Sequence, residues 1–158
     1  MKHRLVLAAM AAVAVLGTGA AVAAGPAQAA PAISAGTYYF FVTGTINCIT
    51  THGVGNQLTV SQTGTCAKIT VSSLGNDVVT FADGNGNCLR ANNSDVVLVE
   101  NGRCNTQDSA EVWTITHVGY RFENDKQALW MKVTGTAIGD KVWVGTGGLT
   151  NWQLAPLS

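Results

Sequence analysis

The chain has 158 residues, of which 47% are hydrophobic and 11% charged, and its nine basic side chains balance its nine acidic ones. This length suits a single domain. The sparse, balanced charge contains no basic cluster, which argues against a nucleic-acid-binding protein and against binding to an anionic membrane surface, because both need positive charge.

The first 29 residues predict a secretory signal peptide. Lys2 and Arg4 precede an apolar run over residues 5–16, and Ala27-Gln-Ala29 fits the small-x-small cleavage pattern. A membrane anchor is the alternative, but the run is shorter than the roughly 20 apolar residues that span a bilayer. Cleavage would leave a secreted, extracellular single domain over residues 30–158, with no membrane insertion. That domain keeps seven basic and all nine acidic residues, so its net charge is −2.

The residues after the predicted signal peptide show one sequence pattern repeated three times. The copies open at Gly36, Gly75 and Gly119, so their starts lie 39 and 44 residues apart. They cover residues 36–74, 75–118 and 119–158. A fixed period near 40 indicates one supersecondary unit whose copies share a core. The last two copies close on Trp113 and Trp152, which we expect to be core residues, because large aromatic side chains dominate small cores.

Short segments rich in β-branched and aromatic residues follow along the copies, separated by Gly, Asn and Asp turns. We predict strands over residues 38–42, 57–61, 68–72, 78–81, 96–99, 112–116, 128–133, 141–144 and 152–154, with strand-like segments around Cys48 and Cys88. No window after residue 33 shows a sustained helical period. About four strands in each of three units make twelve. This count suits an all-β fold of the β-trefoil type, a six-stranded barrel capped by three hairpins; a β-sandwich, which would not need a threefold repeat, is the alternative.

Four cysteines lie in two of the copies, as is common in exported proteins. Cys48 and Cys66 are 18 residues apart, and Cys88 and Cys104 are 16 apart. Four cysteines allow three pairings, and the repeat favours one disulfide within each of these two copies. A zinc site is the competing interpretation, but there is no C-x-x-C and the histidines do not stand in ligand spacing. We therefore expect two disulfides, no metal and no cofactor.

The second copy carries a resemblance to a known family. Its segment Cys88-Leu-Arg-Ala-Asn-Asn-Ser-Asp-Val-Val-Leu-Val-Glu-Asn-Gly-Arg-Cys104, with Trp113-Thr-Ile nine residues further on, resembles one subdomain of a ricin B-type lectin. The final Asn151-Trp-Gln-Leu-Ala-Pro-Leu resembles the last subdomain of that family, without its cysteines. The resemblance implies a β-trefoil that binds carbohydrate without catalysis, with a glycan or polysaccharide as its partner.

The resemblance also indicates where a sugar would be held. In sugar-binding subdomains of that family an Asp stands two residues after the first Cys, whereas here Arg90, Thr50 and Lys132 occupy the corresponding places. The aromatic platform for the sugar has one match, Trp143 in the third copy. Any sugar site in this chain would therefore differ in its residues from the sugar site of that family. We expect it to comprise Trp143 as the stacking ring and, as hydrogen-bonding groups, Lys132, Arg90, Asn92, Asn93 and Asp95.

Two other functions compete with carbohydrate binding: catalysis and protease inhibition. An enzyme needs a base directed at a nucleophile, and no such motif occurs; acid pairs such as Asp108 and Glu111 arise by chance in a chain with nine acids. A secreted protease inhibitor is the stronger alternative, because β-trefoils also present rigid loops to proteases. Arg103, beside Cys104, or Lys141 would then be the basic anchor, and an extracellular protease the partner.

Overall fold

The computed structural model describes residues 33–116, 120–146 and 151–158, and the predicted signal peptide lies outside them. Within these ranges the chain forms strands and turns only, and they contain no helix that could cross a membrane. The strands are β1 (Gly36–Val42), β2 (Cys48–Thr50), β3 (Thr59–Ser61), β4 (Ile69–Gly75), β5 (Val78–Ala82), β6 (Cys88–Ala91), β7 (Val97–Glu100), β8 (Val112–Thr116), β9 (Arg121–Asn124), β10 (Leu129–Val133), β11 (Val142–Gly145) and β12 (Trp152–Pro156).

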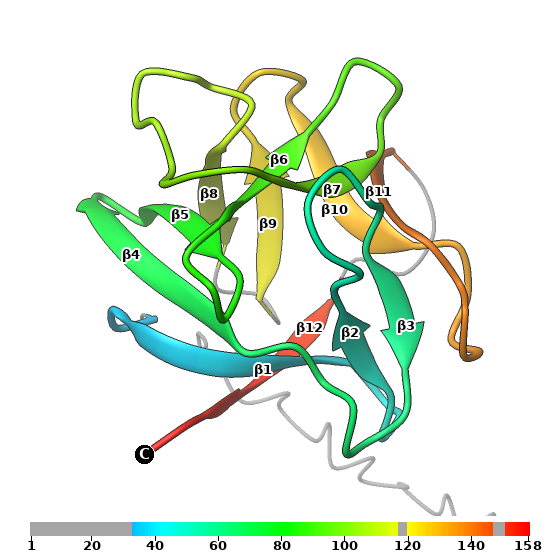
Figure 1. Cartoon of the computed structure of the whole chain (residues 1–158). Helices are drawn as coiled ribbons and strands as arrows, with labels where there is room; N and C mark the ends of the chain where they lie inside the picture. Colours follow the sequence, from blue (N-terminus) through cyan, green and yellow to red (C-terminus); the bar gives the residue numbers. More distant parts are fainter. Residues whose placement is uncertain (1–32, 117–119, 147–150) are drawn as a thin grey trace, which may run out of the picture.

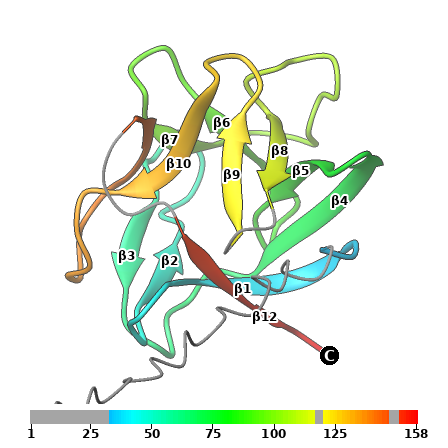
Figure 2. The ribbon, with the colours of Figure 1, turned by 180° about the vertical axis from the view of Figure 1, so that it is seen from behind.

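Six of the strands form a barrel (Figure 1). They pair antiparallel in the order β12, β1, β4, β5, β8 and β9. The amide of Trp152 donates to the carbonyl of Tyr120 at 3.0 Å, which joins β12 to the residue before β9 and closes the ring. Figure 2 shows the first and last barrel strands, β1 and β12, running side by side.

The other six strands form three hairpins that cap the barrel: β2–β3, β6–β7 and β10–β11. The hairpins hydrogen-bond to one another through β7, β11 and the residue just before β3. The Leu58 amide donates to the Val97 carbonyl at 3.0 Å, and the Val142 amide donates to the Leu58 carbonyl at 2.9 Å. A six-stranded barrel closed at one end by three mutually bonded hairpins is a β-trefoil, so the predicted fold is confirmed.

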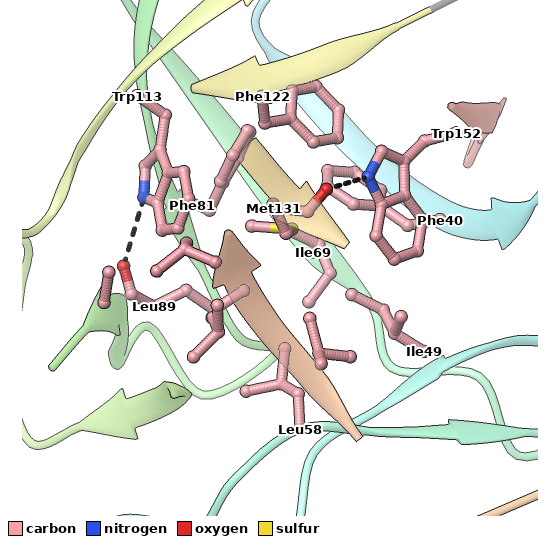
Figure 3. Close-up of a cluster of buried hydrophobic side chains, with 14 of the residues drawn as sticks. Phe40, Ile49, Leu58, Ile69, Phe81, Leu89, Trp113, Phe122, Met131 and Trp152 are labelled. Atoms are coloured by element: carbon pink, nitrogen blue, oxygen red, sulfur yellow. Dashed lines mark hydrogen bonds between the residues drawn. The ribbon is translucent and has the colours of Figure 1, made fainter. Parts of the chain in front are cut away.

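The barrel core contains three phenylalanines that meet one another (Figure 3). Phe40 comes from β1, Phe81 from β5 and Phe122 from β9, and all three are fully buried. Their ring centroids are 4.9 to 5.3 Å apart, close enough for direct aromatic packing. Each phenylalanine lies in the first strand of a successive group of four strands: β1–β4, β5–β8 and β9–β12. These three phenylalanines are therefore equivalent positions, and the residues next to them in each strand can be matched between the three groups.

The closing tryptophans are core residues, as predicted. Trp113 donates its indole N–H to the Leu89 carbonyl at 3.4 Å, and Trp152 donates to the Met131 carbonyl at 3.2 Å (Figure 3). Both rings are buried, so each hydrogen bond satisfies a polar group that water does not reach. Ile69 is the buried residue at the corresponding place in the first group.

The two predicted disulfides are confirmed. Cys48 is bonded to Cys66 and Cys88 to Cys104, with Cα atoms 5.5 and 4.8 Å apart. Each bond ties the first strand of a capping hairpin to the loop that follows the hairpin. The repeat boundaries stay a prediction; β4 ends at Gly75, the residue at which the second copy was expected to begin.

Candidate functional site

The predicted stacking ring and one of its predicted partners lie against each other. Trp143 and Lys132 are opposite residues of the β10–β11 hairpin. The Lys132 ammonium lies 4.0 Å from the centroid of the Trp143 ring, and only 3% of Lys132 is exposed. A buried cation over an indole is attracted by the ring electrons. One face of the half-buried Trp143 ring is therefore covered by protein.

The predicted polar turn lies beside this hairpin. Val96 forms a backbone bridge with Trp143, and the Val144 amide donates to the Asp95 carbonyl at 2.7 Å. Asn92 shapes the turn, because its side-chain oxygen accepts from the amides of Ser94 and Val96, each at 3.0 Å. The structure thus brings Trp143, Lys132 and this turn together, with the Asn92 oxygen already engaged by backbone.

Asn93 and Arg90 are also engaged by other side chains. The Asn93 oxygen accepts from the Lys126 ammonium at 3.0 Å. The Arg90 guanidinium forms ion pairs with Glu100 at 2.6 Å and Asp108 at 3.2 Å, and its hydrogen bond to Glu100 raises its pKa. Arg90 is therefore paired within the second group instead of offering free donors to a sugar.

The acid pair considered for catalysis, Asp108 and Glu111, has structural partners. Asp108 pairs with Arg90 and accepts from the Ala110 amide at 3.0 Å. Glu111 is buried and accepts from the Asn105 amide. Glu111 also lies near the sulfurs of Cys88 and Cys104. Those sulfurs are bonded to each other, so they are not thiolate ligands for a metal.

The two basic residues of the inhibitor alternative lie in different settings. Lys141 is exposed, and its backbone amide donates to the Thr134 hydroxyl at 3.1 Å in the loop before β11. Arg103 is exposed in the loop between β7 and β8, where it lines a hollow on the outer face of β4 and β5.

A further surface was not predicted as a site. Phe40 and Val42 of β1 point into the core, so the alternation of a strand turns Tyr39 and Phe41 outward. Two adjoining hollows of about 130 and 290 Å³ share Phe41 and Thr63 as lining residues. We call this surface the aromatic groove. Its main lining residues are Tyr39, Phe41, Ile46, Thr63, Gln153 and Ala155.

The aromatic groove combines aromatic rings with uncharged polar groups. Gln153 of β12 lies directly opposite Phe41 of β1, so their side chains stand next to each other on one face. The Gln153 amide and the Tyr39 hydroxyl make no hydrogen bond with any residue that the structure describes. No Asp, Glu, Lys or Arg lines either hollow.

The wall of the aromatic groove is held in place by the first disulfide. The Cys48–Cys66 bond fixes the loop after β3, and the Thr63 hydroxyl in that loop donates to the Ile46 carbonyl at 2.6 Å. Ile46 itself is 75% exposed. One feature of the sequence could have indicated this surface. Residues 38–41 are four consecutive aromatic residues, and because side chains alternate along a strand, two of them must face away from the core.

Comparison with known proteins shows the fold and leaves the family open. No known protein-family profile matches the chain, and neither does any curated protein sequence. Among solved structures, a GH43 β-1,3-galactosidase aligns with a TM-score of 0.64 at 14% identity, over 80% of this chain and 28% of that one. The Polyporus squamosus lectin, bound to the epitope Neu5Acα2-6Galβ1-4GlcNAc, aligns with a TM-score of 0.63 at 11% identity, over 79% of this chain and 50% of that one.

A third similar structure has the size of a single trefoil. SeviL bound to asialo-GM1 saccharide aligns with a TM-score of 0.60 at 15% identity, over 79% of this chain and all of that one. The chain thus spans half or less of the first two proteins and the whole length of the third. At these identities the likeness establishes the β-trefoil fold that this chain shares with lectins.

Proposed function

We propose that this protein is a secreted carbohydrate-binding β-trefoil of the ricin B-type lectin kind, which binds neutral sugars in the aromatic groove and performs no catalysis. One observation carries the proposal. An aromatic ring, Phe41, and an amide without a protein partner among the described residues, Gln153, stand side by side in a hollow that no charged side chain lines.

This pair of groups matches the two chemical faces of a sugar. A pyranose ring presents C–H groups on one face, which pack on an aromatic ring, and hydroxyl groups around its edge. A glutamine amide both donates and accepts hydrogen bonds, so the Gln153 side chain can bind two neighbouring hydroxyls at once. The Tyr39 hydroxyl supplies one more donor and acceptor on the same face. A shallow hollow with few well-placed polar groups is the usual form of such a ligand site.

The comparisons support the proposal at the level of the fold. One similar structure is a lectin with a bound glycan epitope, and a second, SeviL, is bound to asialo-GM1 saccharide. A third is a galactosidase, of which this chain covers 28%. Shared folds host many functions, so a sugar site depends on the particular residues of this chain. Secretion rests on the signal-peptide pattern, and the absence of catalysis on the structural partners of Asp108 and Glu111.

The originally predicted site around Trp143 stays a prediction. In that site Lys132 covers one face of the Trp143 ring, and Asn92, Asn93 and Arg90 have partners of their own. The inhibitor alternative has less support. Both predicted anchors, Arg103 and Lys141, are exposed in loops, but such basic residues are common on loops, and Arg103 also lines a hollow.

A glycan array with the mature protein tests the proposal. We expect binding to neutral glycans, and at least about tenfold weaker retention for Phe41→Leu, which removes the ring, and for Gln153→Ala, which removes the amide; tenfold corresponds to about 1.4 kcal/mol. Gln107→Ala, at an exposed glutamine in the loop before β8, is the matched control and should bind like the parent protein. Binding to no glycan, or unchanged binding by both groove variants, would refute this assignment.

A further inference from the structure

The second group of strands has its own hollow at the place that corresponds to the aromatic groove. Phe81 of β5 corresponds to Phe40 of β1 in the core, so Thr80 and Ala82 stand where Tyr39 and Phe41 stand. The neighbouring strand β4 faces β5 as β12 faces β1, with Ser72 opposite Thr80. The hollow has a volume of about 270 Å³, and Arg103 is in its wall.

The polar groups of this hollow have no protein partners among the described residues. The Arg103 guanidinium and the hydroxyls of Ser72, Thr80 and Thr106 make no hydrogen bond or ion pair with any residue in those ranges. The other two arginines in the described part of the chain differ: Arg90 pairs with two carboxylates, and Arg121 donates to Asn151 at 2.8 Å.

The lining of this hollow contains one positively charged side chain and no negatively charged one. No Asp or Glu lines it, so the Arg103 charge is not neutralised by a neighbour in the wall. Among the lining residues, Thr80 is only 5% exposed and belongs to the floor of the hollow, whereas Leu74 is 44% exposed and belongs to its rim. An arginine fork binds a carboxylate through two parallel hydrogen bonds. Hydroxyl groups on the same surface both donate and accept, as hydroxyl groups of a sugar do.

The loop that carries Arg103 is fixed on both sides. Cys104 follows it directly and is bonded to Cys88. The Cys88 amide donates to the Gly102 carbonyl at 3.0 Å, and the Gly102 amide donates to the Asn87 side chain at 3.2 Å. The backbone on either side of Arg103 is therefore positioned before a ligand arrives, which lowers the entropy lost on binding.

We propose that this hollow, which we call the arginine hollow, binds the carboxylate of an acidic sugar residue, with Arg103 holding the carboxylate and the hydroxyls of Ser72, Thr80 and Thr106 holding the sugar. This site lies on strands other than those of the aromatic groove, so it extends the proposed function to a second ligand class. It requires no contribution from Phe41 or Gln153.

Titration of the ¹⁵N-labelled mature protein with methyl glucuronide, followed by NMR, tests this inference. We expect saturable shifts at the amides of Thr80 and Arg103, and at least about tenfold weaker binding by Arg103→Gln. Methyl glucoside, which lacks the carboxylate, and acetate, which lacks the sugar, should each bind at least tenfold more weakly than the glucuronide. Lys141→Gln removes the same charge from an exposed site and should bind like the parent protein.

Each other outcome overturns the inference. Equal binding of acetate would reduce the hollow to an anion site without sugar recognition, and equal binding of methyl glucoside would remove the role of the charge. Unchanged binding by Arg103→Gln would place the ligand elsewhere. Phe41→Leu separates the two proposals: it should leave glucuronide binding intact while weakening neutral glycans. A protein that binds glucuronide but no neutral glycan would support the arginine hollow and refute the aromatic groove.

Discussion

The aromatic groove and the arginine hollow occupy corresponding places on one scaffold and offer opposite chemistry. Both lie on the outer face of two barrel strands, and both have a wall held by a disulfide. The aromatic groove presents Tyr39 and Phe41 and no charge, whereas the arginine hollow presents Thr80, Ala82 and the charge of Arg103. The difference therefore comes from a few outward side chains and leaves the framework unchanged.

The inward side chains explain why the framework can stay the same. Phe40, Phe81 and Phe122 pack against one another in the core, so a change of volume at one of them is felt by the other two. The residues next to them in sequence point outward and lack this constraint. At the third corresponding place stand Arg121 and Glu123, a further combination of charges.

Removing either disulfide should have the largest effect, and each removal should affect one site. We expect Cys48→Ala with Cys66→Ala, and separately Cys88→Ala with Cys104→Ala, to lower the free energy of unfolding by about 3 kcal/mol. Urea unfolding measures this loss. At temperatures where both variants stay folded, the first should lose neutral-glycan binding and the second glucuronide binding. A parallel loss of both ligands in both variants would show that the two sites are not independent.

An aromatic ring placed in the arginine hollow should weaken its binding of an acidic sugar. Ala82→Phe puts an aromatic side chain at the position that corresponds to Phe41, where it occupies part of the hollow. We expect glucuronide binding to weaken by about tenfold, or about 1.4 kcal/mol, while neutral-glycan binding at the aromatic groove is unchanged. Isothermal titration with both sugars measures the two effects, and Lys141→Gln, which changes neither site, serves as the control and should bind both sugars like the parent protein. Unchanged glucuronide binding would show that the sugar does not enter the space beside Ala82.

The Arg90 ion pairs should support the arginine hollow indirectly. Glu100 and Asp108 flank the loop that carries Arg103, and Arg90 joins them. Because these side chains are partly exposed, Arg90→Met should lower the free energy of unfolding by only about 0.5 to 1 kcal/mol. Glucuronide binding should fall a fewfold, and high salt should reproduce part of the loss in the parent protein. Lys141→Met is the control, and an equal effect there would exclude a specific role for these pairs.

The smallest effect is expected at Trp143, whose indole N–H is buried without a partner in the described part of the chain. Trp143→Phe removes that N–H and breaks no hydrogen bond, so the free energy of unfolding should change by less than about 1 kcal/mol. Trp113→Phe is the matched comparison: it leaves the Leu89 carbonyl unpaired in the core and should destabilise by about 1 to 3 kcal/mol. Thermal unfolding compares the two. Loss of glycan binding in Trp143→Phe without loss of stability would favour the β10–β11 hairpin over the aromatic groove as the sugar site.

Much of the fold could be predicted from the sequence, because its signals repeat at a fixed spacing. The equivalent cysteine positions in two copies of the repeat predicted the two disulfides. The position of Trp113 and Trp152 at the end of their copies predicted that both are core residues. The site was harder to predict for a physical reason. Phe41 and Gln153 are far apart in sequence, and they become neighbours only because β1 pairs with β12. Arg90 was predicted as a ligand-binding residue from its place in the lectin resemblance. Its ion pair with Glu100 was missed, because only the pairing of β6 with β7 brings the two side chains together.

The pairing of β1 with β12 has a consequence for the order of events during synthesis and folding. Phe41 enters the barrel with the first strand, but Gln153 arrives beside it only when the last strand has closed the ring. A partly made or partly unfolded chain can therefore display the aromatic ring without the amide that completes the proposed sugar site. Binding to a neutral glycan would then report a finished barrel, and a glycan column would separate closed molecules from open ones.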